Sequence, residues 1–128
     1  MRNILIDSSV WIEYFRGSDK SDNSFIEEII DTNLVCINDL ILSELIPFLR
    51  IKKQKELIDN LSYIRKIPLS IDWSGIIEYQ SVNLRHGINN VGIPDLIILQ
   101  NVIDNDLELM SLDRHFKLMQ KHFNFIIV

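Results

Sequence analysis

Four acidic side chains stand where carboxylates could act together. Asp7 and Asp113 each follow a short apolar run, and Asp95 follows Pro94 at the start of a long apolar stretch. Glu44 lies inside another apolar segment. Carboxylates gathered in one crevice repel each other, and a bound divalent cation relieves that repulsion. Oxygen ligands suit Mg²⁺ or Mn²⁺, so we expect one metal site made of Asp7, Glu44, Asp95 and Asp113.

Each acid also has an ordinary structural explanation. Asp7 and Asp113 are suited to capping the helices that follow them, and Asp95 suits the positive end of a helix dipole. Glu44 differs, because Leu40, Ile41 and Phe48 are its neighbours at helical spacing and no Lys or Arg lies three or four residues away. We expect its carboxylate to face a cation or a water-filled cleft, unless it simply points to solvent.

The histidine and cysteine residues, which could supply nitrogen and sulfur ligands to a metal, form no comparable set. His86, His115 and His122 form no recognisable zinc-binding pattern with Cys36. Cys36, the single cysteine, lies in an apolar run and is expected in the core. A chain without a second cysteine for a disulfide suits a reducing cytoplasm.

Short apolar runs alternate with helical patterns along the whole chain. We expect strands at 3–6, 34–37, 67–69, 107–110 and 125–128. Helices are expected at 8–17, 25–30, 39–49, 52–66, 72–86, 94–105 and 114–122, with a polar loop at 18–24 and a kink or break at Pro47. This alternation predicts a three-layer α/β/α fold with a central parallel sheet, whose ligands bind at the carboxyl ends of the strands.

Composition is that of an ordinary folded protein. The 128 residues are 47% apolar and 24% charged, which suits a single domain over 1–128. A net charge of −5 argues mildly against nucleic-acid binding, but setting aside four metal-binding acids would leave the chain almost neutral. No apolar run reaches the roughly 18 residues of a membrane helix, and no secretory signal is visible.

Four segments together resemble the PIN-domain family, and within it the VapC-like toxins of toxin–antitoxin pairs. The segments are 4–12, 38–45, 92–98 and 111–116, which contain Asp7, Glu44, Asp95 and Asp113 in order. The resemblance implies that these acids bind Mg²⁺ or Mn²⁺ and are catalytic. It also assigns Ser9 and Ser111 a supporting role.

The family resemblance carries further expectations. It implies metal-dependent hydrolysis of RNA phosphodiester bonds that leaves a 5′ phosphate, inhibition by a cognate antitoxin, and a homodimer. The chain departs from the family in the bulky residues Leu96 to Leu99, and Leu99 stands where some relatives have a further acid. A second metal is therefore expected to bind weakly or not at all.

RNA also requires cations to meet its backbone. Arg50, Lys52, Lys53 and Arg114 are candidates, although a solvated helix face would explain the first three equally well. The aromatic residues of 11–15 could stack on bases, line a partner groove or belong to the core or a dimer interface.

Other protein classes fit less well. A receiver-type signalling domain needs paired acids after its first strand, and a haloacid-dehalogenase-like phosphatase needs an acid where Ser9 stands. A housekeeping nuclease of RNA processing and a catalytically inactive PIN-like binding module remain alternatives.

Overall fold

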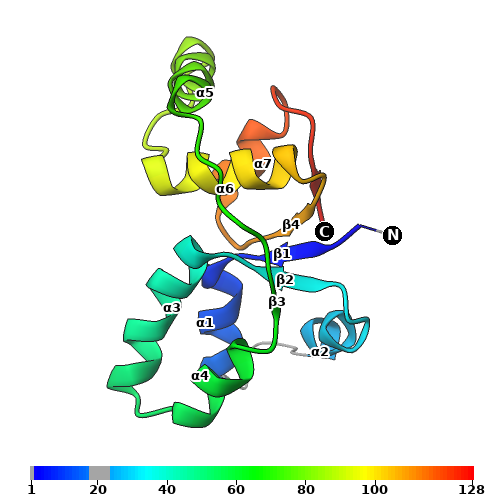
Figure 1. Cartoon of the computed structure of the whole chain (residues 1–128). Coiled ribbons are helices and arrows are strands. Elements are labelled where there is room, and N and C mark those ends of the chain that lie inside the picture. The colour runs from blue at the N-terminus through cyan, green and yellow to red at the C-terminus, as the bar shows by residue number, and fades with distance from the viewer. Residues whose placement is uncertain (1, 18–23) are drawn as a thin grey trace.

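The computed structural model describes residues 2–17 and 24–128, and a five-stranded parallel sheet runs through its middle (Figure 1). The strand order is β3-β2-β1-β4-β5, and every neighbouring pair is parallel. The strands are β1 (Ile4–Ile6), β2 (Val35–Ile37), β3 (Arg65–Lys66), β4 (Glu108–Met110) and β5 (Ile126–Ile127).

Helices cover both faces of the sheet, which confirms the predicted three-layer α/β/α fold. One face carries α1 (Ser8–Arg16), α2 (Ser24–Asp31), α3 (Asp39–Ile51) and α4 (Lys55–Leu61). The other carries α5 (Trp73–Arg85), α6 (Ile93–Asp104) and α7 (Arg114–Met119) (Figure 1). The chain moves outward from β1 to β3 and then returns to β4 on the far side of β1, so the strand order reverses between β1 and β4. Ligands of such sheets bind at this reversal.

The core lies on both sides of the two central strands. All residues of β1 and β2 are buried, including Cys36, as its apolar surroundings predict. Burial raises the pKa of the Cys36 thiol to about 11, against a smaller opposing effect of Arg65. From the other face, α6 contributes Leu96, Ile98 and Leu99 to the same core, since apolar residues occur nearly all round this helix.

The segment after α3 differs from the prediction. The helix expected over 52–66 is only α4, because Lys53 adopts a left-handed φ of 56° and separates it from α3. The third strand lies at Arg65–Lys66 instead of 67–69. Ile67 donates one more bond to the Ile37 carbonyl at 2.8 Å, but Pro68 has no N–H with which to extend the ladder.

Pro47 does not end its helix, because α3 continues through it to Ile51. Proline removes the bond to the carbonyl four residues earlier, here that of Ser43. Both residues are exposed, so water can satisfy this carbonyl.

The polar loop expected at 18–24 lies outside the described residues except for Ser24. Among the described helices, none has the length and apolar character needed to cross a membrane.

Candidate metal centre

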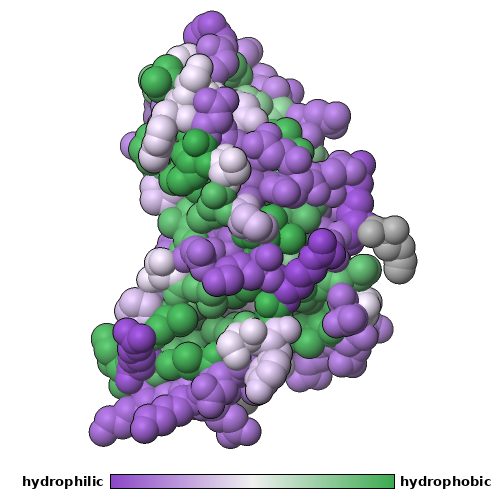
Figure 2. Space-filling view, in the orientation of Figure 1, coloured by the Kyte–Doolittle hydropathy of each residue, from purple (hydrophilic) through white to green (hydrophobic). Residues whose placement is uncertain are grey.

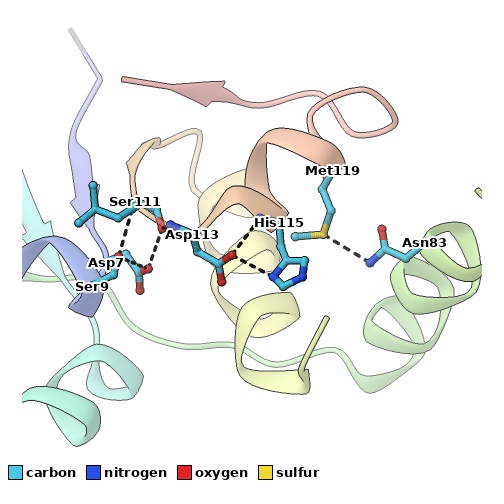
Figure 3. Close-up of polar contacts among 8 residues, drawn as sticks. Asp7, Ser9, Asn83, Ser111, Asp113, His115 and Met119 are labelled. Atoms are coloured by element: carbon cyan, nitrogen blue, oxygen red, sulfur yellow. Dashed lines mark hydrogen bonds and ion pairs between the residues drawn. The ribbon is translucent and has the colours of Figure 1, made fainter. Parts of the chain in front are cut away.

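Asp7 leaves the carboxyl end of β1 and is held by three donors, and Figure 3 draws the Ser9 and Ser111 side chains beside it. Its Oδ1 accepts the Ser8 backbone N–H at 2.8 Å, which makes Asp7, not Ser8 or Ser9, the cap of α1. Its Oδ2 accepts the Ser9 hydroxyl at 3.0 Å and the Ser111 hydroxyl at 2.8 Å. The side chain is thus buried, at 6% exposure, but hydrogen-bonded on both oxygens. The two serines predicted to support the site both bind this carboxylate.

The same serines join the ends of β1 and β4. Ser111 Oγ accepts the Asp113 backbone N–H at 3.0 Å, and Ser9 Oγ accepts the Leu112 N–H at 3.1 Å. Each hydroxyl therefore donates to Asp7 and accepts from the β4–α7 turn. Asp7 and Asp113 are fixed relative to each other across the strand-order reversal, although they lie 106 positions apart in the sequence.

Asp113 caps α7 and contacts a histidine that the sequence did not single out. Its Oδ1 accepts the His115 backbone N–H at 2.9 Å, and the His115 Nδ1 lies 2.9 Å from the same oxygen. A signal was present, because a histidine two residues after a capping Asp can fold back onto it. The spacing of the three histidines indicates no zinc site with Cys36, and zinc-binding spacing alone does not predict this contact.

Asp95 lies in the first turn of α6, after Pro94, and is half-buried. Burial raises the pKa of its carboxyl, and the nearby Asp113 and Asp7 carboxylates raise it further. A hydrogen bond from the Gly92 backbone and the charge of His115 oppose this increase. Asp95 is therefore held where its negative charge is unfavourable unless a cation joins it.

Glu44 projects from α3 towards the same carboxylates and remains exposed. Partial desolvation raises the pKa of its carboxyl, with further contributions from Asp7 and Asp95, while a hydrogen bond with the Ser8 side chain lowers it. Ser8 is thus a further polar neighbour of the site that its position in the sequence did not single out. The structure brings all four predicted acids to one edge of the sheet.

The tightest donor group is smaller than this set of four. Asp95, Asp113 and His115 each offer a ligand atom within 4.8 Å of the others, the one such group among the described residues. Asp7 and Glu44 face this group without joining it at that distance. An oxygen-rich set of mutually repelling carboxylates fits a hard divalent cation such as Mg²⁺ or Mn²⁺. Leu99 is fully buried, so its turn of α6 offers no additional ligand.

A pair of buried asparagines connects two elements that carry the acids. Asn38 caps α3 by accepting the Ile41 N–H at 2.9 Å, and its Nδ2 donates to Asn101 Oδ1 on α6 at 3.0 Å. Asn101 Nδ2 donates in turn to the Pro68 carbonyl at 3.1 Å. The helices that carry Glu44 and Asp95 are therefore fixed to each other beneath the site. Sequence reasoning assigned these asparagines no role.

The predicted RNA-binding residues fall in two places. Arg114 is exposed directly after Asp113 at the start of α7, while Arg50, Lys52 and Lys53 lie at the far end of α3. Lys52 is eight residues beyond Glu44, which is about 12 Å along the helix axis. There a cavity of about 220 Å³ is lined by Phe15, Arg16, Phe48, Lys52 and Gln54.

The aromatic residues of α1 form one cluster. The Trp11 and Phe15 rings stack with centroids 5.6 Å apart, and Trp11 is 3% exposed. This agrees with core packing, but Trp11 Nε1 has no acceptor among the described residues. An apolar cavity of about 250 Å³ opens beside it and is lined from α1, α2 and the α4 region.

Comparison with known families identifies the class of protein. A family model described as "PIN domain" matches residues 4–121, and the chain belongs to this family. No curated protein matches the sequence.

Solved structures share this fold at low sequence identity. DNA-bound VapBC from Salmonella typhimurium has a TM-score of 0.71 and 18% identity, covering 91% of this chain and 92% of that one. VapBC2 from Rickettsia felis, bound to a promoter DNA fragment, has a TM-score of 0.72 and 18% identity, covering 98% and 96%. A toxin–antitoxin complex from Klebsiella pneumoniae has a TM-score of 0.61 and 19% identity, covering 88% of each chain.

Proposed function

We propose that this protein is a metal-dependent endoribonuclease and the toxin of a toxin–antitoxin pair. The observation that carries the proposal is the gathering of four carboxylates from β1, α3, α6 and the β4–α7 turn around the reversal of strand order. Membership of the PIN family supports nuclease chemistry, and the fold shared with VapBC structures supports the narrower role.

Each acid has a definite part in this proposal. Asp95 and Asp113 are the central ligands, and Asp7 and Glu44 close the site from the other side. A divalent cation bound there supplies hydroxide near neutral pH and neutralises charge on the phosphate. The Ser9 and Ser111 hydroxyls hold Asp7 Oδ2 in place, which leaves a lone pair of Oδ1 for the cation or its water.

The RNA would be held by basic side chains, one beside the acids and others at the far end of α3. In the proposal, Arg114 meets a phosphate beside the site, and the strand follows α3 to Lys52, Arg50 and Lys53. The Phe15 and Phe48 side chains offer an aromatic wall for a base beside Lys52. Such an arrangement explains how a chain of net charge −5 would bind RNA. Its acidic side chains hold a metal ion, while its basic side chains contact the RNA backbone.

The apolar cavity beside Trp11 is our proposed docking site for the antitoxin. Partner proteins are present in the VapBC and toxin–antitoxin structures that share the fold. A peptide seated on α1, α2 and α4 would cover the cavity and bury its apolar lining.

A second copy of the chain is proposed to cover α5. Trp73, Ile77 and Leu84 are 58%, 68% and 60% exposed on this helix. In Figure 2, hydrophobic side chains lie among hydrophilic ones over this helix at the top of the molecule. Exposed apolar patches of this kind mark interaction surfaces.

RNA cleavage by purified protein, free of any partner, tests the proposed activity. Assays with Mn²⁺, Mg²⁺ or EDTA would run beside the Asp7→Asn variant. We expect cleavage that requires metal and is lost in the variant, with products that carry 5′ phosphates. Cleavage that survives both EDTA and Asp7→Asn would overturn the mechanism. Failure to cut diverse RNAs by folded, metal-bound protein would favour an inactive binding module.

A further inference from the structure

His115 lies within the candidate metal centre, and two different roles are open to its imidazole. The ring can bind the cation through a nitrogen, or it can hold Asp113 while Asp113 binds the cation. The Nδ1 atom lies 2.9 Å from Asp113 Oδ1, and the two side chains are only 23% and 30% exposed. The contacts of this one oxygen distinguish the two roles.

Asp113 Oδ1 already accepts the His115 backbone N–H at 2.9 Å. If Nδ1 carried no proton, its lone pair would face a carboxylate oxygen at 2.9 Å and the two would repel. A proton on Nδ1 turns the same contact into a hydrogen bond. A protonated Nδ1 cannot bind a metal, because a ligand nitrogen must offer its lone pair. The other ring nitrogen, Nε2, keeps its lone pair, but it lies on the edge of the ring that is turned away from Asp113 (Figure 3). That lone pair therefore does not face a cation held by Asp113.

The two N–H groups together occupy both lone pairs of Oδ1. Asp113 Oδ2 is then the oxygen left to bind a cation, on a carboxylate that cannot rotate without losing two bonds. Histidines and carboxylates that orient ligands in this way commonly change metal affinity 10- to 100-fold when they are removed. The ring also lies close enough to Asp95 for its charge to lower the pKa of that carboxyl.

We propose that His115 is a positioning residue that orients Asp113 for the cation and does not itself bind it. This inference rests on the proposed function, in which the acids hold a divalent cation. Its consequence is selectivity: a site that keeps only oxygen ligands prefers Mg²⁺ or Mn²⁺, whereas a nitrogen ligand would favour Zn²⁺.

Mn²⁺ provides the test, because its electron paramagnetic resonance reports both affinity and ligand type. The free-Mn²⁺ signal would be titrated for the wild type, His115→Leu, His115→Asn and the control His122→Leu, whose imidazole is exposed outside the site. Leucine removes the donor, while the asparagine Nδ2 can donate from nearly the position of the imidazole Nδ1. We expect His115→Leu to weaken binding about 10-fold, His115→Asn to restore most of it, and His122→Leu to match the wild type.

Electron spin echo envelope modulation of the Mn²⁺-loaded wild type completes the test. We expect no modulation from a directly bound nitrogen. Modulation that disappears in His115→Asn would show that the imidazole is a ligand and would overturn the proposal, as would equal affinity in all four proteins. A folded wild type that binds no Mn²⁺ would instead refute the proposed metal site itself. Thermal unfolding in EDTA would verify that every variant is folded.

Discussion

At the scale of single residues, capping a helix and binding a cation are compatible roles for one carboxylate. Asp7 and Asp113 each use Oδ1 to cap the helix that follows. The second oxygen of Asp7 is fixed by two hydroxyls. The second oxygen of Asp113 has no hydrogen-bond partner among the described residues. Either acid can therefore cap its helix and also bind a cation, although the sequence presented these two roles as alternatives.

Asp95 should destabilise the metal-free protein. Its raised pKa means that its negative charge is held unfavourably by burial and by the Asp113 and Asp7 carboxylates. In EDTA at pH 7, Asp95→Asn should raise the midpoint of thermal unfolding by about 2–4 °C, roughly 1 kcal/mol for a chain of this size. Addition of Mn²⁺ should stabilise the wild type and leave this variant nearly unchanged. Asp104→Asn, on the exposed end of the same helix, is the matched control and should behave as the wild type does.

The stability difference between Asp95→Asn and the wild type should depend on pH, because the pKa of the Asp95 carboxyl is raised in the folded protein. Because the folded-state pKa of the Asp95 carboxyl lies above the ordinary value near 4, the folded protein takes up this proton before the unfolded chain does. The unfavourable contribution is therefore full at neutral pH and declines as pH falls through the raised pKa. The advantage of Asp95→Asn in EDTA should shrink between pH 7 and pH 4. An advantage that stayed constant over this range would contradict the assignment.

At the scale of elements, the buried Asn38 fixes the two helices on which Glu44 and Asp95 lie. Asn38→Ala removes a helix cap, worth about 1 kcal/mol, and leaves Asn101 Oδ1 without its donor, which costs about 1–3 kcal/mol more. We expect a total loss of about 2–4 kcal/mol in urea unfolding. Asn60→Ala, on exposed α4, should stay within about 0.5 kcal/mol of the wild type. Equal stability of the two variants would show that the asparagine pair carries no such role.

The far end of α3 gives a second prediction at this scale. In the Asp7→Asn background, where RNA should bind without being cut, Lys52→Glu should weaken binding of a single-stranded RNA about 10-fold at low salt and reduce its salt dependence. Fluorescence anisotropy of a labelled RNA measures both. Lys121→Glu, an exposed residue after α7, makes the same charge change elsewhere. An identical loss from both variants would indicate only net charge, not a site on α3.

At the scale of the whole molecule, the exposed apolar residues of α5 predict self-association. Ile77→Glu places a charge in the centre of this face, and a buried charge without a partner is strongly unfavourable in an interface. We expect the wild type to sediment as a dimer and Ile77→Glu as a monomer, with unchanged thermal stability of the monomer. Glu78→Gln on the neighbouring position should leave the dimer intact. A wild type that sediments as a monomer at high concentration would refute this surface.

The sequence by itself determined the layered α/β fold and the elements on which the four acids lie. Apolar periodicity and the chain's alternation of strand and helix are local properties, and they sufficed because buried parallel strands and amphipathic helices have distinct patterns. Predictions from local sequence patterns failed where contacts with distant residues determine the structure. The third strand lies at Arg65–Lys66, and not at 67–69, because these two residues pair with β2.

Only the tertiary structure decided how the site is built. Ser9 and Ser111 bind one carboxylate from opposite ends of the sequence, and Asn38 reaches Asn101 across 63 positions. His115 entered the site through the geometry of the α7 cap. Hydrogen bonds depend on distances and directions of a few tenths of an ångström, which no one-dimensional pattern specifies. The residue types therefore indicated the chemistry, and the fold determined which atoms remain available to carry it out.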